Sequence, residues 1–217
     1  MSNHTVSVAH QFDDREQQNE ASTLGMWIFL ATEILFFGGM FLAYTVYRWL
    51  YPDAFALASH HMDVTLGAIN TAVLLTSSLT MALAVRASQV GSRNESVLLL
   101  VATMMLGMAF LGIKAFEYAH KFEEHLVPGP DFQFDAAAHA AHAEIYFILY
   151  FLLTGVHALH MIIGVGLVGV ITFMAWRGRF TPEYYSPVEI SGLYWHFVDV
   201  VWIFLFPLLY LINLALN

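Results

Sequence analysis

Residues 194–202 read Tyr-Trp-His-Phe-Val-Asp-Val-Val-Trp and lie inside an apolar run that extends over 190–216. At helical spacing Trp195, Asp199 and Trp202 share one face, and His196 precedes Asp199 by three residues. A charged carboxylate at the centre of a membrane helix costs about 2.5–3.5 kcal/mol on insertion scales. We therefore expect this face to turn toward protein. A packing face with a satisfied polar pair is the simpler interpretation, and a proton or ligand site is the alternative.

The composition of the chain is typical of a polytopic membrane protein. Its 217 residues are 59% hydrophobic and only 12% charged, and the mean hydropathy is +0.63. The absence of cysteine excludes disulfides, thiolate-bound metals and iron–sulfur centres. The net charge of −9 argues against a nucleic-acid partner.

Five apolar runs predict an all-α bundle of five transmembrane helices in a single membrane domain over 1–217. About 20 apolar residues are needed to cross a bilayer. After a polar tail over 1–23, we expect helices at about 24–50, 64–87, 96–119, 143–176 and 190–216.

Local signals predict how the first helix begins, packs and ends. Ser22 or Thr23 is expected to cap its start. Gly38, Gly39 and Ala43 are expected to offer a small face for close helix contact. Tyrosines and tryptophans over 44–51 are expected to form an interfacial belt, and the proline at 52 to end the helix.

The distribution of cations predicts an N-terminus on the inner side of the membrane. Under that topology the inner side holds Arg15, Arg86, Arg93, Arg177 and Arg179. The outer side holds Arg48 and Lys121, with Lys114 added if its side chain snorkels toward water, as we expect. The excess of inner cations favours N-in and C-out.

Two acids stand nine residues into the first and fifth apolar runs, at Glu33 and Asp199. Each is then about 14 Å deep from the same side, so the two carboxyls could share one buried polar network if their helices touch. The alternative is that each pairs locally, for example Asp199 with a tryptophan N–H or with His196. A third buried acid, Glu117, is expected to pair with Lys114, three residues earlier.

Histidines in the apolar runs raise the question of haem or metal ligation. His157 and His160 are one helical turn apart. By helical rise His160 is about 24 Å and His196 about 9 Å from the inner end, and this offset is too large for one iron. Four further histidines over 118–143 match no recognised metal spacing. We expect no metal site in this chain.

Several motifs resemble subunit III of the haem–copper terminal oxidases, and the resemblance covers nearly all of 24–216. These motifs are Thr32–Phe37, Glu117–Tyr118, Leu152–Gly164 and Tyr194–Trp202. The two helices that precede the glutamate helix in longer members are absent, as in the five-helix bacterial forms. The sequence Tyr-Trp-His-Phe-Val-Asp in the last motif and the glutamate at position 33 resemble the cytochrome c oxidase branch of the family more than the quinol oxidase branch.

The resemblance implies a non-redox accessory subunit of a proton-pumping oxidase in aerobic respiration. Such a subunit stabilises subunit I by direct packing, supports proton uptake, and contacts membrane lipids and other subunits, including subunit II. It implies no catalytic residue and no metal in this chain, with haem and copper in partner subunits, and it allows a bound phospholipid. It places the chain in the bacterial inner membrane, with a cytoplasmic N-terminus and a periplasmic C-terminus.

The family uses its matched residues as buried groups with structural or proton-related roles. In this sequence they are Glu33, Glu117, His157, His160, Glu189, His196 and Asp199, with Trp195 and Trp202 as packing or lipid-facing aromatics. Two other readings remain beside a cytochrome c oxidase subunit. One is subunit III of a quinol oxidase. The other is a proton-coupled carrier, although the chain lacks the repeated halves and broken helices typical of carriers.

Overall fold

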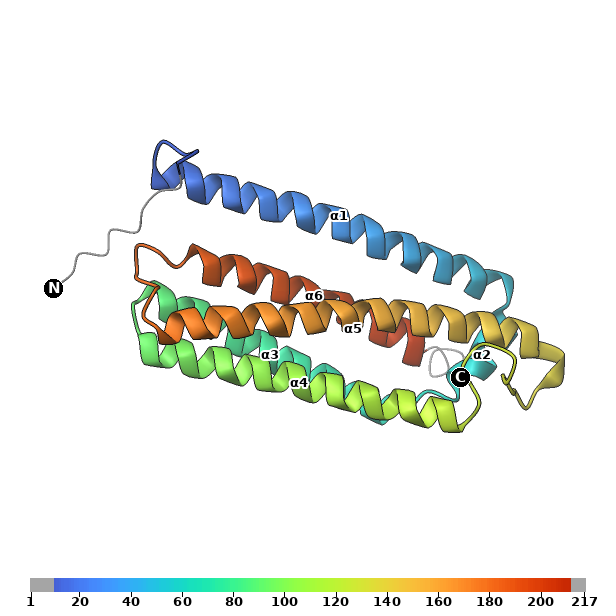
Figure 1. Cartoon of the computed structure of the whole chain (residues 1–217). Coiled ribbons are helices and arrows are strands. Elements are labelled where there is room, and N and C mark those ends of the chain that lie inside the picture. Colours follow the sequence, from blue (N-terminus) through green and yellow to red (C-terminus); the bar gives the residue numbers. More distant parts are fainter. Residues whose placement is uncertain (1–9, 212–217) are drawn as a thin grey trace.

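The computed structural model describes residues 10–211 as a bundle of long helices, which confirms the all-α prediction (Figure 1). Five of these helices are long and apolar enough to cross a membrane. In chain order they are α1 (Arg15–Leu50), α3 (Val64–Gln89), α4 (Arg93–Glu123), α5 (Ala140–Trp176) and α6 (Ser186–Tyr210). A short helix, α2 (Pro52–Ser59), and a single 3-10 turn, η1 (Ala137–His139), lie between them.

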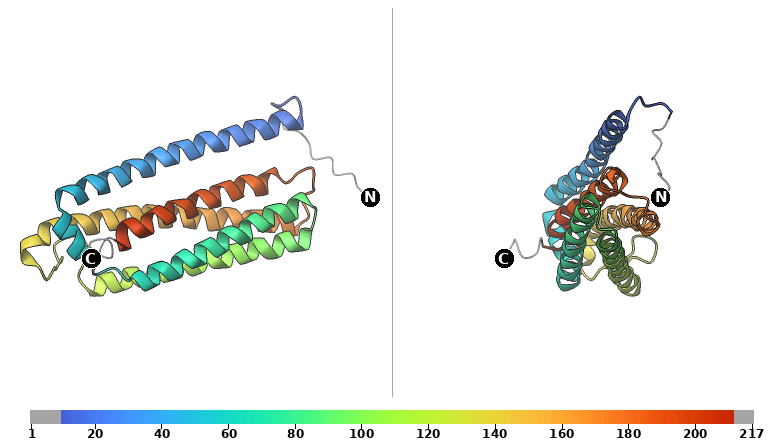
Figure 2. Two further views of the ribbon diagram at one scale, coloured as in Figure 1. Left: turned by 180° about the vertical axis from the view of Figure 1, so that it is seen from behind. Right: turned by 90° about the vertical axis from the view of Figure 1, so that its left-hand side faces the viewer.

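Helices α3 to α6 form a four-helix bundle, and α1 lies along its side against α5 and α6 (Figure 2). The start of α1, the α3–α4 turn and the α5–α6 loop meet at one end of the molecule (Figure 1). The opposite end holds α2, the α4–α5 connection and the end of α6 (Figure 1). Successive long helices are joined at alternating ends of the bundle, which accounts for the antiparallel packing of neighbours such as α3 and α4.

Helix α1 begins nine residues earlier than the predicted start at 24. Its N-cap is Asp14, whose carboxylate accepts a hydrogen bond from Gln17 N at 2.8 Å, so the expected cap at Ser22 or Thr23 is wrong. The polar residues over 15–23 are mostly fair helix formers and extend the helix beyond its apolar run. Hydropathy therefore located the membrane-crossing part but not the helix start.

Pro52 ends α1 as predicted, but it also begins α2. Proline is favoured in the first turn of a helix because its missing N–H would have no partner there. Helix α2 packs against α5 with Phe55 fully buried. Asp63 then caps α3 by accepting from Leu66 N at 3.0 Å. No helix was predicted in this connection from the sequence.

The later helices also begin or end outside their predicted bounds. Helix α4 continues to Glu123, α5 begins at Ala140, and α6 begins at Ser186 with Pro187 in its first turn. The predicted fifth helix extended to 216, and its last residues lie outside the described part of the chain. Gly178 adopts a φ of 72° just beyond α5, a conformation that favours glycine after a helix end.

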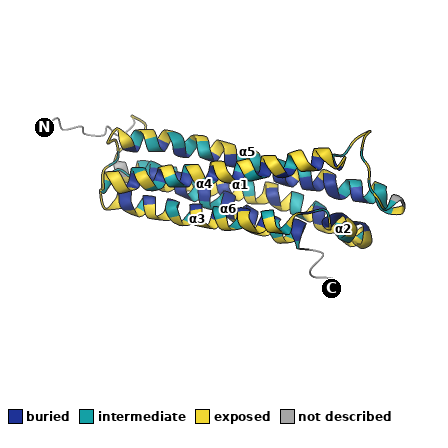
Figure 3. Ribbon diagram, turned by 90° about the horizontal axis from the view of Figure 1, so that it is seen from below, coloured by how far each residue is buried: buried dark blue, intermediate teal, exposed yellow. Residues whose placement is uncertain are grey.

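The core lies between α3, α4, α5 and α6, where the buried faces of the helices meet (Figure 3). Trp195 and Trp202 of α6 are among its largest fully buried side chains. Gly107 of α4 makes room for Trp195, since a Cβ at Gly107 would lie 2.6 Å from the indole ring. The outer faces carry many exposed apolar side chains, as expected for surfaces that meet lipid or other membrane subunits.

Candidate functional site

The α6 face predicted from the sequence is buried in the bundle. Trp195, Asp199 and Trp202 all point inward, so the tryptophans are packing residues and not lipid-facing ones. Trp195 Nε1 donates to Ser77 Oγ and Trp202 Nε1 donates to Thr71 Oγ1, each at 3.0 Å. The tryptophan N–H groups are thus used by α3, and the expected pairing of Asp199 with one of them is wrong.

Asp199 is 2% exposed, and neither carboxyl oxygen has a hydrogen bond of standard geometry to any residue in the described range. The hydroxyl of Ser78 on α3 lies close enough to interact with this carboxyl. The same hydroxyl bonds to His196 Nδ1 at 2.7 Å. His196 is therefore paired with Ser78 of α3. The local alternative, in which Asp199 pairs with His196, is not observed.

Glu33 of α1 pairs with His160 of α5, with Oε2 and Nε2 3.1 Å apart. The two side chains are 18% and 13% exposed, so the contact is largely shielded by protein. The Phe37 ring lies 5.2 Å from the imidazole, edge to face. Tyr194 of α6 donates to the His160 carbonyl oxygen at 3.0 Å, which ties the three helices together at this level.

The bonds of His160 define how many protons this contact holds. Its Nδ1 lies 2.9 Å from the Val156 carbonyl oxygen, which can only accept, so Nδ1 carries a hydrogen. The contact between Nε2 and the Glu33 carboxyl then needs one further proton, on either atom. The geometry therefore provides one protonatable pair between α1 and α5.

Glu33 and Asp199 lie at a similar depth, as predicted, but they are not directly bonded. Phe29 stacks on Tyr194 with ring centroids 6.1 Å apart, and Phe41 meets Phe204 at 6.5 Å, so α1 and α6 run side by side across both acids. Glu33 turns to His160, whereas Asp199 turns into the bundle. The proposed sharing of one direct network is not observed.

The position of His157 shows that the predicted depths of the histidines in α5 and α6 were wrong. Its ring lies 5.4 Å from the Trp202 ring and 5.5 Å from Phe110, so the middle of α5 is level with the middle of α6. The predicted offset of about 15 Å is too large, because α6 begins before Ile190 and the depth of its residues was underestimated. Within residues 10–211, no group of three or more histidine, aspartate or glutamate side chains could hold a metal ion. Neither ring nitrogen of His157 has a partner in that range.

Lys114 and Glu117 form a buried ion pair in α4 at 3.0 Å, which confirms the predicted pairing. Lys114 is 3% exposed, so the expectation that it snorkels to water is wrong. Its Nζ donates to Tyr210 at 2.8 Å and to Tyr150 at 3.2 Å. Both tyrosines donate to Glu117 Oε1, at 2.5 and 2.8 Å. Every charge in this cluster therefore has partners from three helices.

Two further tyrosines hold the end of α6. Tyr44 of α1 donates to the Leu208 carbonyl oxygen at 2.5 Å, and Tyr146 of α5 donates to that of Leu209 at 2.6 Å. Carbonyls in the last turn of a helix lack intrahelical partners, and tyrosine hydroxyls supply them here. Tyr44 is fully buried, so its expected place in an interfacial belt is wrong, whereas Trp49 is exposed as a belt residue should be.

Glu189 does not belong to the buried set. It lies exposed in the first turn of α6, at the end of the bundle where that helix begins. A carboxylate at a helix N-terminus interacts favourably with the helix dipole, which accounts for an acid at this place.

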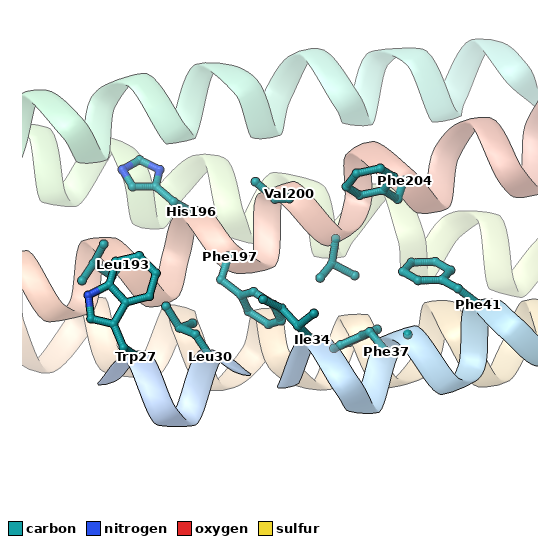
Figure 4. A pocket seen from close by; sticks show the side chains of 12 residues that line it. Trp27, Leu30, Ile34, Phe37, Phe41, Leu193, His196, Phe197, Val200 and Phe204 are labelled. Carbon is teal, nitrogen blue, oxygen red and sulfur yellow. The ribbon is translucent and has the colours of Figure 1, made fainter. Parts of the chain in front are cut away.

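An apolar groove of about 470 Å³ separates part of α1 from α6 (Figure 4). In Figure 4 the side chains of Trp27, Leu30 and Ile34 face α6 from α1. His196 is the one titratable side chain among the residues that line the groove. Gly38 also lines it, and a Cβ at Gly38 would meet nothing within 4 Å among the described residues. The small face of α1 is therefore open at Gly38, and no helix of the described part of this chain makes the expected close contact there.

The residues that pair with the buried groups were not predicted from the sequence. Ser77, Ser78, Tyr150 and Tyr210 were not singled out as partners from the sequence. A signal was available for α3, because Ser77 stands on one stripe with Asn70 and Leu74, which the structure also buries.

Together the fold and these sites define a polytopic membrane protein with protonatable groups inside its helix bundle. The family model described as "Cytochrome c oxidase subunit III" matches residues 5–213. The chain therefore belongs to the cytochrome c oxidase subunit III family, and it is a subunit III of a haem–copper oxidase. This membership confirms the resemblance found in the motifs.

Curated relatives cover nearly the whole chain. "Quinol oxidase subunit 3" of Bacillus spizizenii is 34% identical over 204 residues, which are 92% of this chain and 93% of the relative. The protein of the same name from Bacillus subtilis is also 34% identical over 204 residues. "Probable quinol oxidase subunit 3" of Staphylococcus haemolyticus is 30% identical over 205 residues, 94% of each chain. These names favour the quinol oxidase alternative over the cytochrome c reading.

Proposed function

We propose that this chain is the non-redox accessory subunit III of a proton-pumping quinol oxidase. The observation that carries the proposal is the match of nearly the whole chain to the subunit III family, together with relatives named as quinol oxidase subunits. The shielded acids Glu33 and Glu117 support a non-redox role, because their carboxyl groups bond to side chains of neighbouring helices and are not left free as ligands. Haem and copper then belong to partner subunits, and oxygen reduction takes place there.

The role of the chain in this proposal is to stabilise the catalytic subunit I by packing against it. Exposed apolar side chains along the bundle, such as Leu35 and Ile163, suit a surface that is covered by another membrane subunit or by lipid. Contact with subunit II is part of the same proposal. The exposed apolar faces of the bundle would also suit the acyl chains of bound phospholipid.

We further propose a bacterial cytoplasmic membrane location with the N-terminus inside. Arg86, Arg93, Arg177 and Arg179 lie at the end where α1 begins (Figure 1). The opposite end carries Arg48 and Lys121. Lys114 and Lys121 are both 3% exposed, so Arg48 is the cation that remains accessible at this end among the described residues, and the inner excess is larger than the sequence alone indicates.

Substitution of Glu33 by glutamine tests the accessory role. An accessory subunit predicts that the purified Glu33→Gln oxidase reduces oxygen at its normal initial rate. Its proton coupling or its working lifetime over many turnovers should change, because glutamine cannot hold the proton of the contact with His160. The initial rate, the proton-to-electron ratio and the inactivation half-life measure these effects. Loss of haem from the Glu33→Gln complex would contradict the proposal.

The electron donor is tested by the composition of the purified complex. A quinol oxidase predicts oxidation of quinol and no dinuclear copper centre in the partner subunits. A dinuclear copper centre together with direct oxidation of reduced cytochrome c would restore the cytochrome c reading. Either outcome leaves the assignment to the subunit III family unchanged.

A further inference from the structure

We propose that Asp199 holds an exchangeable proton inside the bundle, and that Ser78 and His196 conduct this proton to the bundle surface. The proposal concerns three side chains on two adjacent helices, α3 and α6. It does not depend on which electron donor the oxidase uses. It assigns a second proton site to the chain, separate from the Glu33–His160 contact.

The first observation is the isolation of the Asp199 carboxyl. It is 2% exposed, and both oxygens lack a hydrogen bond of standard geometry within residues 10–211. A buried charge without a partner costs far more than a buried neutral group. Trp195 and Trp202 lie about one turn on either side of Asp199 on the same helix face. Their indole N–H groups donate to hydroxyls of α3 and not to the Asp199 carboxyl. The carboxyl is therefore not used as a helix-packing acceptor.

The second observation is that polar side chains lie between this carboxyl and the groove between α1 and α6. Ser78 Oγ lies within interaction range of Asp199 and bonds to His196 Nδ1 at 2.7 Å. His196 is only partly buried and lines the groove between α1 and α6. The three side chains thus lead from a fully buried acid to a half-buried imidazole through one hydroxyl.

Proton transfer along these groups balances without any other reactant. The Asp199 carboxyl gives its proton to Ser78 Oγ as the Ser78 hydroxyl gives its own proton to His196 Nδ1. His196 releases the proton on Nε2 to water, which leaves a carboxylate, an intact hydroxyl and the other neutral imidazole tautomer. The reverse steps reprotonate Asp199. In heavy water this cycle replaces hydrogen by deuterium on the carboxyl with no net change.

Other titratable groups around Asp199 are engaged elsewhere or are separated from this route. Glu33 and His160 bond to each other between α1 and α5. Lys114 and Glu117 bond to each other and to tyrosines. His157 of α5 faces Phe110 and Trp202. The polar side chains of α3 at this level carry hydroxyl or amide groups, which do not titrate.

Infrared difference spectroscopy of the purified oxidase in heavy water tests the proposal. The wild-type complex should show a carboxylic acid C=O band that shifts in heavy water and is lost in Asp199→Asn. In Ser78→Ala and in His196→Phe the shift should be slower by about tenfold or more, because a positioned proton donor is missing.

Ser77→Ala is the matched control, because Ser77 neighbours Ser78 but bonds to Trp195. Its exchange rate should equal that of the wild type. The proposal is overturned if Asp199→Asn removes no acid band. It is also overturned if Ser78→Ala exchanges as fast as Ser77→Ala, since Asp199 would then be a structural group with no route through Ser78. Ser78→Ala and Ser77→Ala keep the test available if Asp199→Asn does not assemble.

Discussion

Replacing Lys114 by methionine should strongly destabilise the bundle. Methionine has a similar length but no charge, so it leaves the Glu117 carboxylate without its cation in a site where the lysine is 3% exposed. Lys114 Nζ also makes bonds to Tyr150 at 3.2 Å and to Tyr210 at 2.8 Å. Removing one partner of a buried ion pair costs about 3–5 kcal/mol, because the remaining charge is uncompensated.

Lys121→Met provides a control on the same helix. Lys121 is buried to the same degree, but its partner Glu124 is 34% exposed and can be solvated when the lysine is lost. Its other bond is to the His61 carbonyl oxygen at 2.6 Å. The expected cost of Lys121→Met is therefore about 1–2 kcal/mol, from one lost hydrogen bond and one partly exposed ion pair.

The free energies can be measured by titration with SDS in mixed micelles, with helix content followed by circular dichroism. The double variant Lys114→Met/Glu117→Gln should be more stable than Lys114→Met alone, because no unpaired charge remains and the amide oxygen can still accept from Tyr150 and Tyr210. A cost for Lys114→Met no larger than that for Lys121→Met would refute the reasoning. So would a double variant less stable than Lys114→Met.

Two further predictions concern packing and capping. Gly107→Ala should cost about 1–3 kcal/mol because its Cβ would meet the Trp195 ring at 2.6 Å, whereas Gly112→Ala on the same helix has open space and should be neutral or stabilising. The same SDS titration compares them, and equal stabilities would contradict the close contact. Tyr44→Phe should cost about 1 kcal/mol by removing the bond to the Leu208 carbonyl. Amide hydrogen exchange at the end of α6 should become faster, and unchanged exchange there would argue against a capping role.

The sequence predicted the features that depend on hydropathy and helical spacing. The five membrane helices follow from five apolar runs, because lipid demands apolar side chains over the full span. The Lys114–Glu117 pair follows from a three-residue spacing. The similar depth of Glu33 and Asp199 follows from two helices that start on the same side.

The partners of the buried groups could not be predicted, because they depend on which faces of distant helices meet. The contact of Glu33 with His160 requires α1 to lie against α5, and no local pattern specifies that. The coordination of Lys114 by Tyr150 and Tyr210 likewise joins three helices. The depth argument for the histidines was wrong because a few residues of error at each helix end produce several ångströms of error in depth.

The most direct test of the account is a haem and copper analysis of the purified oxidase before and after this chain is removed. All haem and copper should stay with the remaining subunits, the depleted enzyme should still reduce oxygen initially, and the separated chain should bind neither. Haem or copper bound stoichiometrically to the separated chain would contradict the account.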